Sequence, residues 1–184
     1  MKHTTAQDKQ KGIYEAMKAK FGYKNMLQAP RIEKVLLSST TGSIKDPKKK
    51  ALIGDRLTKI AGQKATVKSA KKSVASFKVR QGDSVGWQAT LRGERMWSFL
   101  EKLVNIALPR TRDFRGIELK SIDAMGNYTL GIKEHTVFPE TSDEDIKDVF
   151  GFAVNIVTSA KTKAETEEVL KQLGFLFKKI DTAK

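Results

Sequence analysis

The residues best suited to binding chemistry lie in a basic segment in the middle of the chain. The stretch KSAKKSVASFKVRQGDSVG, Lys68–Gly86, holds five Lys and Arg residues, one phenylalanine and a single acid, Asp83. Lysine binds phosphates without reading base sequence, arginine can bind a phosphate or a base edge, and an aromatic ring can stack on a base. The segment therefore indicates nucleic-acid contact through Phe77 and Arg80. The alternative is an ordinary hairpin with Phe77 in the core.

A second basic cluster follows in the stretch PRTRDFRG, residues 109–116, where Arg110, Arg112 and Arg115 surround Phe114. Three arginines in six residues suit a phosphate or a folded RNA groove. The alternative is a structural turn in which Asp113 pairs with one of them. The chain has no zinc-finger spacing, no basic region with heptads and no helix-turn-helix pattern, so RNA is favoured over DNA.

Three residues could also support hydrolysis. Asp113, Glu118 and Lys120 resemble the acid and E-x-K set of magnesium-dependent nucleases, although they fall in an expected loop and not on adjacent strands. Cysteine is absent and histidine occurs only at positions 3 and 135, which leaves no thiolate or histidine metal site. The composition therefore excludes cysteine- and histidine-based sites, and the magnesium-dependent nuclease is kept as an alternative.

Charge is distributed unevenly along the chain. The net charge is +14, and residues 45–120 hold nineteen Lys and Arg against seven Asp and Glu, whereas residues 121–184 hold eight against eleven. Such polarity favours a polyanionic partner for the middle of the chain. The acidic stretch PETSDEDIKD, residues 139–148, lacks the glycine and glutamate spacing of a calcium loop. It is either a solvated helix start or a docking segment for a basic protein.

Apolar periodicity and turn residues predict the elements. We expect helices over residues 6–21, from Asp46-Pro47 to Gly62, over 94–108 until Pro109, and from the capping box at Thr162 to Gly174. We expect strands over residues 31–39, 77–82, 85–93, 128–133 and 152–158, and a long loop over 109–127. The stretches FKVRQG and VGWQATLRG should pair as a ribbon, and the helix over 94–108 reads as apolar nearly all round.

These elements predict an α+β fold in which an antiparallel or mixed sheet has helices on one face, within one domain spanning residues 1–184. Alternation places Val85, Trp87, Ala89 and Leu91 beneath the helices, and turns Gln88, Thr90 and Arg92 to an open face available to RNA. No apolar run is long enough to span a bilayer and no secretory signal is present, so we expect a cytoplasmic protein without membrane contact.

Several motifs occur together in consistent order. They are GQKA (62–65), AKKSVASFKVRQGDSVG (70–86), TLRGERMWSFLEKL (90–103), PRTRDFRG (109–116), GNYTLGI (126–132) and FPE (138–140). Together they resemble the bacterial-type family of ribosomal large-subunit protein five, over roughly residues 14–179.

The resemblance implies a structural protein with no enzymatic activity, metal or cofactor. Such a protein binds 5S rRNA and holds it in the central protuberance of the large subunit, in a bacterial or organellar ribosome. It implies 5S rRNA contacts at Gln63, Phe77, Arg80, Thr90 and Arg92. It also implies a loop facing the peptidyl-site tRNA, at Lys71, Lys72, Ser73 and Lys78, and an inter-subunit bridge to small-subunit protein thirteen, at Glu140, Asp143, Glu144 and Asp145. Further partners implied are 23S rRNA and neighbouring large-subunit proteins.

Two positions depart from the family pattern. Ser38 stands where the family commonly has Asn, and Ala153 where it commonly has Asp. Serine reaches less far than asparagine and alanine forms no side-chain hydrogen bond, so we expect a weakened or rearranged contact there. A free-standing RNA-binding module remains an alternative to a ribosomal protein.

Overall fold

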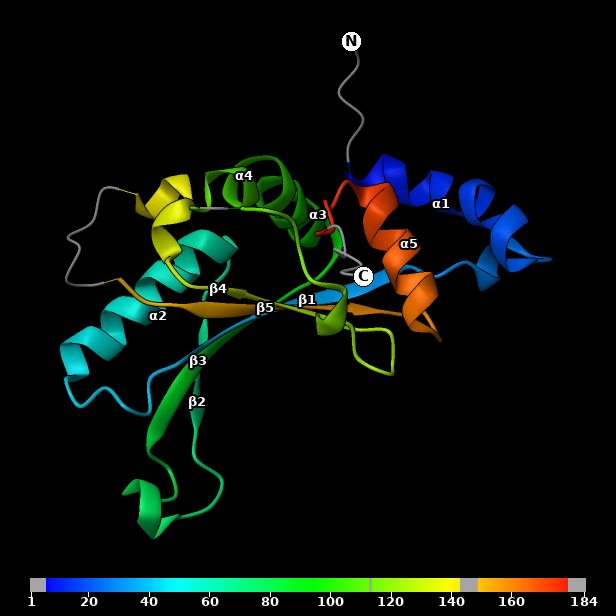
Figure 1. Cartoon of the computed structure of the whole chain (residues 1–184). Helices are drawn as coiled ribbons and strands as arrows, with labels where there is room; N and C mark the ends of the chain where they lie inside the picture. Colours follow the sequence, from blue (N-terminus) through cyan, green and yellow to red (C-terminus); the bar gives the residue numbers. More distant parts are fainter. Residues whose placement is uncertain (1–5, 113, 143–148, 179–184) are drawn as a thin grey trace, which may run out of the picture. The chain divides into compact units, whose positions relative to one another are not determined.

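The computed structural model describes residues 6–112, 114–142 and 149–178 and has the predicted α+β architecture (Figure 1). The chain divides into two compact units. Unit 1 comprises Met1–Val35, Arg92–Leu130 and Asn155–Lys184, and unit 2 comprises Leu36–Leu91 and Gly131–Val154. In the part of the chain that is described, no helix is both long and apolar enough to cross a membrane.

A five-stranded antiparallel sheet has the order β2-β3-β1-β5-β4. Its strands are β1 (Ile32–Thr40), β2 (Thr66–Ser69), β3 (Ser84–Leu91), β4 (Tyr128–Ile132) and β5 (Phe152–Thr158). The unit boundaries fall inside β1, β4 and β5, so these three strands run from one unit into the other.

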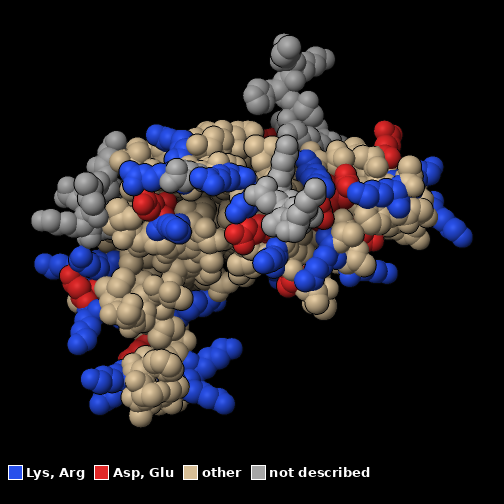
Figure 2. All heavy atoms as spheres, in the orientation of Figure 1, with Lys and Arg blue, Asp and Glu red and all other residues tan. Residues whose placement is uncertain are grey.

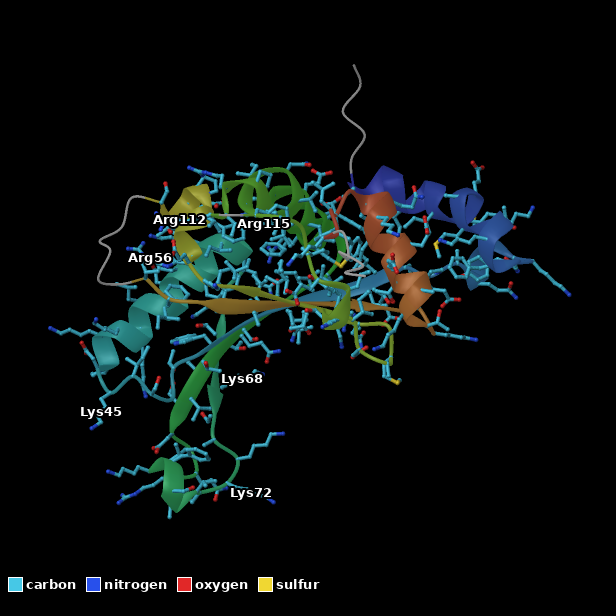
Figure 3. The ribbon with its side chains drawn as sticks, in the orientation of Figure 1. Lys45, Arg56, Lys68, Lys72, Arg112 and Arg115 are labelled. Atoms are coloured by element: carbon cyan, nitrogen blue, oxygen red, sulfur yellow. The ribbon has the colours of Figure 1, made fainter. Side chains whose placement is uncertain are left out.

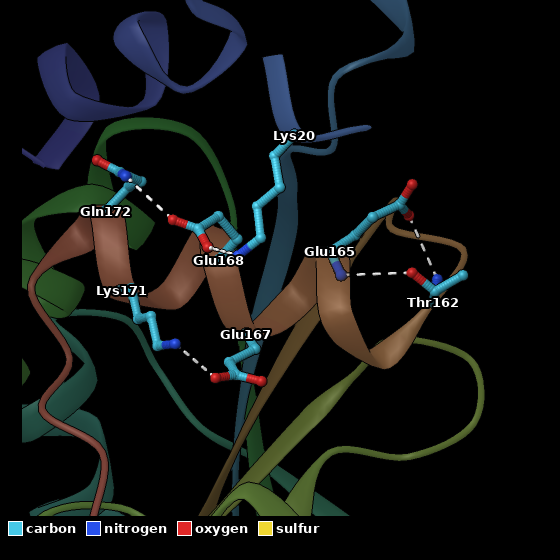
Figure 4. A network of polar contacts seen from close by, with 7 residues as sticks. All are labelled: Lys20, Thr162, Glu165, Glu167, Glu168, Lys171 and Gln172. Atoms are coloured by element: carbon cyan, nitrogen blue, oxygen red, sulfur yellow. Dashed lines mark hydrogen bonds and ion pairs between the residues drawn. The ribbon is translucent and has the colours of Figure 1, made fainter. Parts of the chain in front are cut away.

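The helices of unit 1 pack on one another. They are α1 (Ala6–Phe21), α3 (Gly93–Lys102) and α5 (Lys163–Leu173), and α3 continues as a π-helical turn, Leu103–Ala107, and a last helical turn, α4 (Leu108–Arg110). Helix α1 contacts both α5 and α3. Lys20 of α1 donates to Glu168 of α5 at 2.6 Å (Figure 4), and this hydrogen bond lowers the pKa of the Glu168 carboxyl. The pair therefore stabilises the fold at neutral pH and loses that contribution once acid protonates Glu168.

Helix α2 (Pro47–Ala61) packs on β3 within unit 2. Asp46 caps its start by accepting from the Lys48 amide at 2.9 Å, and Gly62 ends it at a φ of 63°. Near mid-helix, Gly54 lies directly against the indole of Trp87. A Cβ atom at position 54 would stand 2.5 Å from that ring, so only glycine allows α2 to lie this close to the sheet.

The strands bury alternate side chains. In β1 the buried positions are Ile32, Val35, Leu37 and Ser39, which alternate from Val35 onward, and in β5 they are Phe152, Val154, Ile156 and Thr158. In β3, Ala89 and Leu91 are buried and Thr90 is exposed, as the alternation predicts, while Val85, Trp87 and Gln88 are half-buried. In each unit one set of strand side chains therefore forms core and the other set remains accessible.

Short 3₁₀ turns connect these elements at Met26–Gln28, Ala75–Phe77, Leu119–Ser121, His135–Val137 and Pro139–Thr141. The turn at Ala75–Phe77 corrects one sequence prediction, because FKVRQG is not a strand. The strand that forms the hairpin with β3 is β2, with Thr66 opposite Gln88. The apolar alternation of FKVRQG led to a wrong strand prediction because Lys78 adopts a φ of 52°. This conformation reverses the chain and does not occur in a β-strand.

The helix predicted over residues 94–108 is also corrected in two respects. Pro109 does not stop it, since proline fits the start of a helical turn and Pro109 lies within α4. The helix is not apolar all round either: Arg95, Ser98 and Asn105 are exposed opposite the buried Met96 and Phe99. The predicted bounds of α1, α2, β5 and α5 are confirmed.

The single-domain prediction can be tested by calorimetry. Because three strands pass through both units, neither unit can unfold without breaking strands of the other, and we expect one cooperative transition. The calorimetric and van't Hoff enthalpies should then agree. Two resolved transitions would show that the units fold independently.

Candidate nucleic-acid interface

The basic segment forms the β2–β3 hairpin of unit 2. All residues from Lys71 to Lys78 are exposed, as are Lys68 and Arg80. Figure 2 shows Lys and Arg side chains projecting on several sides of the hairpin end, and Figure 3 shows Lys68 beside the strands and Lys72 at the far end. Mutual repulsion of these cations is reduced most by an anionic partner.

Hydrogen bonds between backbone groups make the end of the hairpin a defined structure. The Ala70 amide donates to the Asp83 carbonyl at 2.9 Å, and the Gly82 amide donates back to the Ala70 carbonyl at 3.0 Å. Further out, the Val74 amide donates to the Val79 carbonyl at 2.9 Å. The lysines are therefore presented from an ordered base.

Two polar side chains are used to close this loop. Ser73 accepts from the Gln81 amide at 2.9 Å, and the Asp83 carboxylate accepts from the Arg80 amide at 2.8 Å. We predicted Ser73 only as a tRNA-facing residue and gave Asp83 no role. The signal was present, since Ser and Asp commonly bind backbone amides in turns.

Phe77 lies in water beside the turn at Lys78. Its side chain is 78 % exposed, so the alternative that placed it in the core is wrong. The left-handed conformation of Lys78 directly follows it. An exposed aromatic ring among lysines is the combination that binds unstacked bases.

The other predicted sheet-face residues of unit 2 lie far from Phe77. The Gln63 amide group donates to the Thr90 carbonyl at 3.2 Å, which brings this pair together at one end of β3. Phe77 and Arg80 lie beyond the opposite end of β3, and a strand of that length spans roughly 20 Å at about 3.3 Å per residue. A single RNA could contact both groups only by following the hairpin.

Arg92 belongs to unit 1, where it precedes α3. Its side chain is exposed, and its guanidinium donates to the Glu33 carbonyl at 3.5 Å, a long bond that leaves most of its donors accessible. Ser38 and Ala153, the two departures from the family pattern, are both half-buried strand residues of unit 2.

The arginine-rich loop of unit 1 is held by its glycine. Arg110, Arg112 and Arg115 are all exposed, and Figure 3 labels the last two. Gly116 has a φ of 104°, and a Cβ there would meet the Lys178 amide nitrogen at 2.6 Å. The next residue, Ile117, donates its amide to the Leu176 carbonyl at 2.7 Å. The C-terminal end of the arginine-rich loop is thus held against the segment Leu176–Lys178, while Arg110 at its other end is the last residue of α4.

Of the acidic-segment residues and the nuclease candidates, some are described by the structure and some are not. Glu140 is exposed in the turn Pro139–Thr141. Asp143, Glu144 and Asp145 lie outside the described residues, as does Asp113. Glu118 and Lys120 are exposed around a 3₁₀ turn. Among the described residues there is no group of three or more His, Asp or Glu side chains that could hold a metal ion.

Comparison with known proteins decides the family. Residues 25–80 match the family described as Ribosomal protein L5, and residues 84–177 match the family model that describes the C-terminus of the same ribosomal proteins. The chain belongs to the ribosomal protein L5 family. This makes it a structural constituent of the ribosome and not an enzyme, so the nuclease and the free-standing RNA-binding module are set aside.

Curated relatives agree with this membership. The chain is 50 % identical to "Large ribosomal subunit protein uL5" of Desulfotalea psychrophila over 89 % of this chain and 92 % of the relative. It is 48 % identical to the protein of the same name from Heliobacterium modesticaldum, over 92 % of this chain and 94 % of the relative. The corresponding values for Thermoanaerobacter sp. are 47 %, 92 % and 96 %.

Replacing Gly116 with alanine should destabilise this L5 family member by about 2–3 kcal/mol, because alanine is strained at that φ and its Cβ meets backbone. Urea unfolding would measure the loss. The matched control is Gly131→Ala, where no heavy atom lies within 4 Å and φ is not positive; this variant should be as stable as the parent or slightly more so. Equal effects of the two substitutions would contradict the tight anchoring of the arginine-rich loop.

Proposed function

We propose that the chain binds 5S rRNA and attaches it in the central protuberance of the large ribosomal subunit, next to 23S rRNA and neighbouring proteins. The observation that carries this proposal is the β2–β3 hairpin, whose cations are exposed while its one acid, Asp83, accepts from backbone. The resemblance to family members that bind 5S rRNA supports the identity of the partner.

Binding begins with electrostatic attraction. The excess of cations over residues 45–120 draws the RNA toward the hairpin, and condensed counterions are released on contact. With six to ten phosphate contacts, affinity would fall by roughly 10³–10⁵ between 50 and 200 mM salt. This component provides affinity but little discrimination between RNAs.

We assign discrimination between RNAs to the side chains that can recognise the shape of the folded RNA. Thr90 and Arg92 offer an exposed hydroxyl and a guanidinium, and Gln63 is oriented by its hydrogen bond to the Thr90 carbonyl. Phe77 stacks on a base and Arg80 binds a phosphate or base edge at the other end of the hairpin. The arginine-rich loop adds phosphate contacts through Arg110, Arg112 and Arg115. Ser38 makes a shorter contact than asparagine would.

The far end of the hairpin is assigned a second partner. Lys71, Lys72, Ser73 and Lys78 surround a compact turn well away from Gln63 and Thr90, which suits contact with the peptidyl-site tRNA. The acidic segment 139–148, with Glu140, Asp143, Glu144 and Asp145, is assigned to the bridge with small-subunit protein thirteen, whose basic character would complement it.

Arg92→Ala should weaken 5S rRNA binding by about 1–3 kcal/mol, because an exposed multidentate donor is lost. Filter binding at fixed salt would measure it. Lys18→Ala removes the same charge from an exposed position in unit 1 with no assigned RNA contact and should have little effect. Equal losses in the two variants would reduce the role of Arg92 to net charge alone. Binding of the parent protein to 5S rRNA no tighter than to a random RNA of equal length would overturn the proposed function.

Lys72→Ala should leave 5S rRNA binding within about twofold and weaken peptidyl-site tRNA binding by ribosomes carrying the variant, because the resemblance assigns Lys72 to the tRNA-facing loop and not to the 5S rRNA contacts. Arg92→Ala provides the reciprocal control, with the opposite pattern in the two assays. A large loss of 5S rRNA binding in Lys72→Ala would refute this division of the hairpin.

A further inference from the structure

A groove in unit 1 has no role in the function proposed above. Its volume is about 650 Å³, and it lies between the segment after α1 and the start of α5. Its lining residues from the first segment are Tyr23, Leu27, Gln28 and Arg31, and those from the second are Ser159, Lys161 and Glu165. All seven residues belong to unit 1 and none lies in the basic hairpin or the arginine-rich loop.

One wall of the groove carries an exposed apolar side chain on a short 3₁₀ turn. Leu27 is 86 % exposed and its neighbour Met26 is 59 % exposed. Asn25 accepts from the Leu27 amide at 3.1 Å, and Gln28 accepts from the Lys24 amide at 2.9 Å, so two side chains cap the N-terminal end of this single 3₁₀ turn. Leu27 lines the groove and Met26 precedes it in the chain, so the groove has exposed apolar surface on this wall.

The opposite wall contains the groove's one acid, and its oxygens are already engaged. Glu165 accepts from the Lys161 amide at 2.7 Å and from the Tyr23 hydroxyl at 2.9 Å. It also forms the capping box with Thr162, as Figure 4 shows. Burial, together with the hydrogen bond to Glu165, raises the pKa of Tyr23, which therefore keeps its proton and remains a donor.

The groove contains two cationic side chains. Arg31 and Lys161 are exposed, and within the described parts of the chain neither side chain takes part in an ion pair. The backbone of Arg31 is held by Ser159, whose amide donates to the Arg31 carbonyl at 2.9 Å and whose hydroxyl accepts from the Arg31 amide at 3.0 Å. The Lys161 amide is held by its hydrogen bond to Glu165. The groove therefore offers two positive charges, an engaged acid and an apolar rim.

We propose that this groove binds an unpaired stretch of large-subunit rRNA, with phosphates at Arg31 and Lys161 and a base against Leu27. A nucleic-acid strand carries a charge at every nucleotide with a flat apolar base between, which matches two cations beside one apolar contact. The choice of RNA over an acidic peptide rests on the proposed function, which already places the chain in an RNA particle.

The test uses the full chain with Arg31→Gln and Lys161→Gln combined. Lys18→Gln with Lys120→Gln is the matched control, because it removes the same charge from exposed positions of unit 1 outside the groove. Two probes are titrated separately: 5S rRNA and a protein-free large-subunit rRNA transcript. We expect the groove variant to bind the large-subunit transcript about tenfold more weakly, with a salt slope reduced by about 1.4 for two phosphate contacts on single-stranded RNA. Its affinity for 5S rRNA should match that of the control.

Equal effects of the two double variants on the large-subunit transcript would overturn the proposal, as would a selective loss of 5S rRNA binding. A failure of the parent protein to prefer 5S rRNA would instead contradict the proposed function, so the two outcomes are distinguishable. As a second readout, Leu27 is replaced by the photo-crosslinker p-benzoylphenylalanine in assembled subunits. Crosslinks to rRNA support the proposal, and crosslinks to a protein show that the rim docks a polypeptide.

Discussion

The burial of alternate strand side chains is the constraint on which the rest of the molecule depends. A strand turns successive residues to opposite sides, so hiding Val35, Leu37 and Ser39 of β1 necessarily turns the residues between them the other way. The same rule in β3 buries Ala89 and Leu91 and frees Thr90. A protein with this arrangement obtains an accessible surface of fixed backbone at no cost to its core.

The charge distribution is compatible with folding because the cations extend from an ordered hairpin and do not crowd the core. The acid that could have neutralised a lysine, Asp83, accepts a backbone amide, and Ser73 does likewise. These bonds maintain the turn while leaving the exposed lysines of the hairpin available to a phosphate. Local order and accessible positive charge are therefore obtained together.

Much of this could be predicted from sequence because caps and alternation are local. Asp46 and Gly62 bracket α2, Thr162 and Gly174 bracket α5, and β5 follows its apolar alternation. The wrong strand prediction for FKVRQG had a different origin. Lys78 adopts a left-handed conformation that depends on contacts across the loop, and the residue types in the stretch do not predict it. The groove beside Arg31 and Lys161 was also missed, because its walls are about 130 residues apart in the chain and only the pairing of the segments around Arg31 and Ser159 brings them together. The exposure of single side chains such as Phe77 could not be predicted either, because an aromatic residue in a hairpin can equally belong to the core.

The contact between Gly54 and Trp87 carries an evolutionary consequence. Glycine inside a helix costs about 1 kcal/mol relative to alanine, yet alanine is sterically excluded while the indole occupies the space. A relative with alanine at the equivalent of position 54 should therefore carry a smaller residue at the equivalent of 87, and would recover the helical propensity lost here. Positions 54 and 87 therefore form a compensating pair, and we expect alanine at position 54 to be tolerated only together with a smaller residue at position 87.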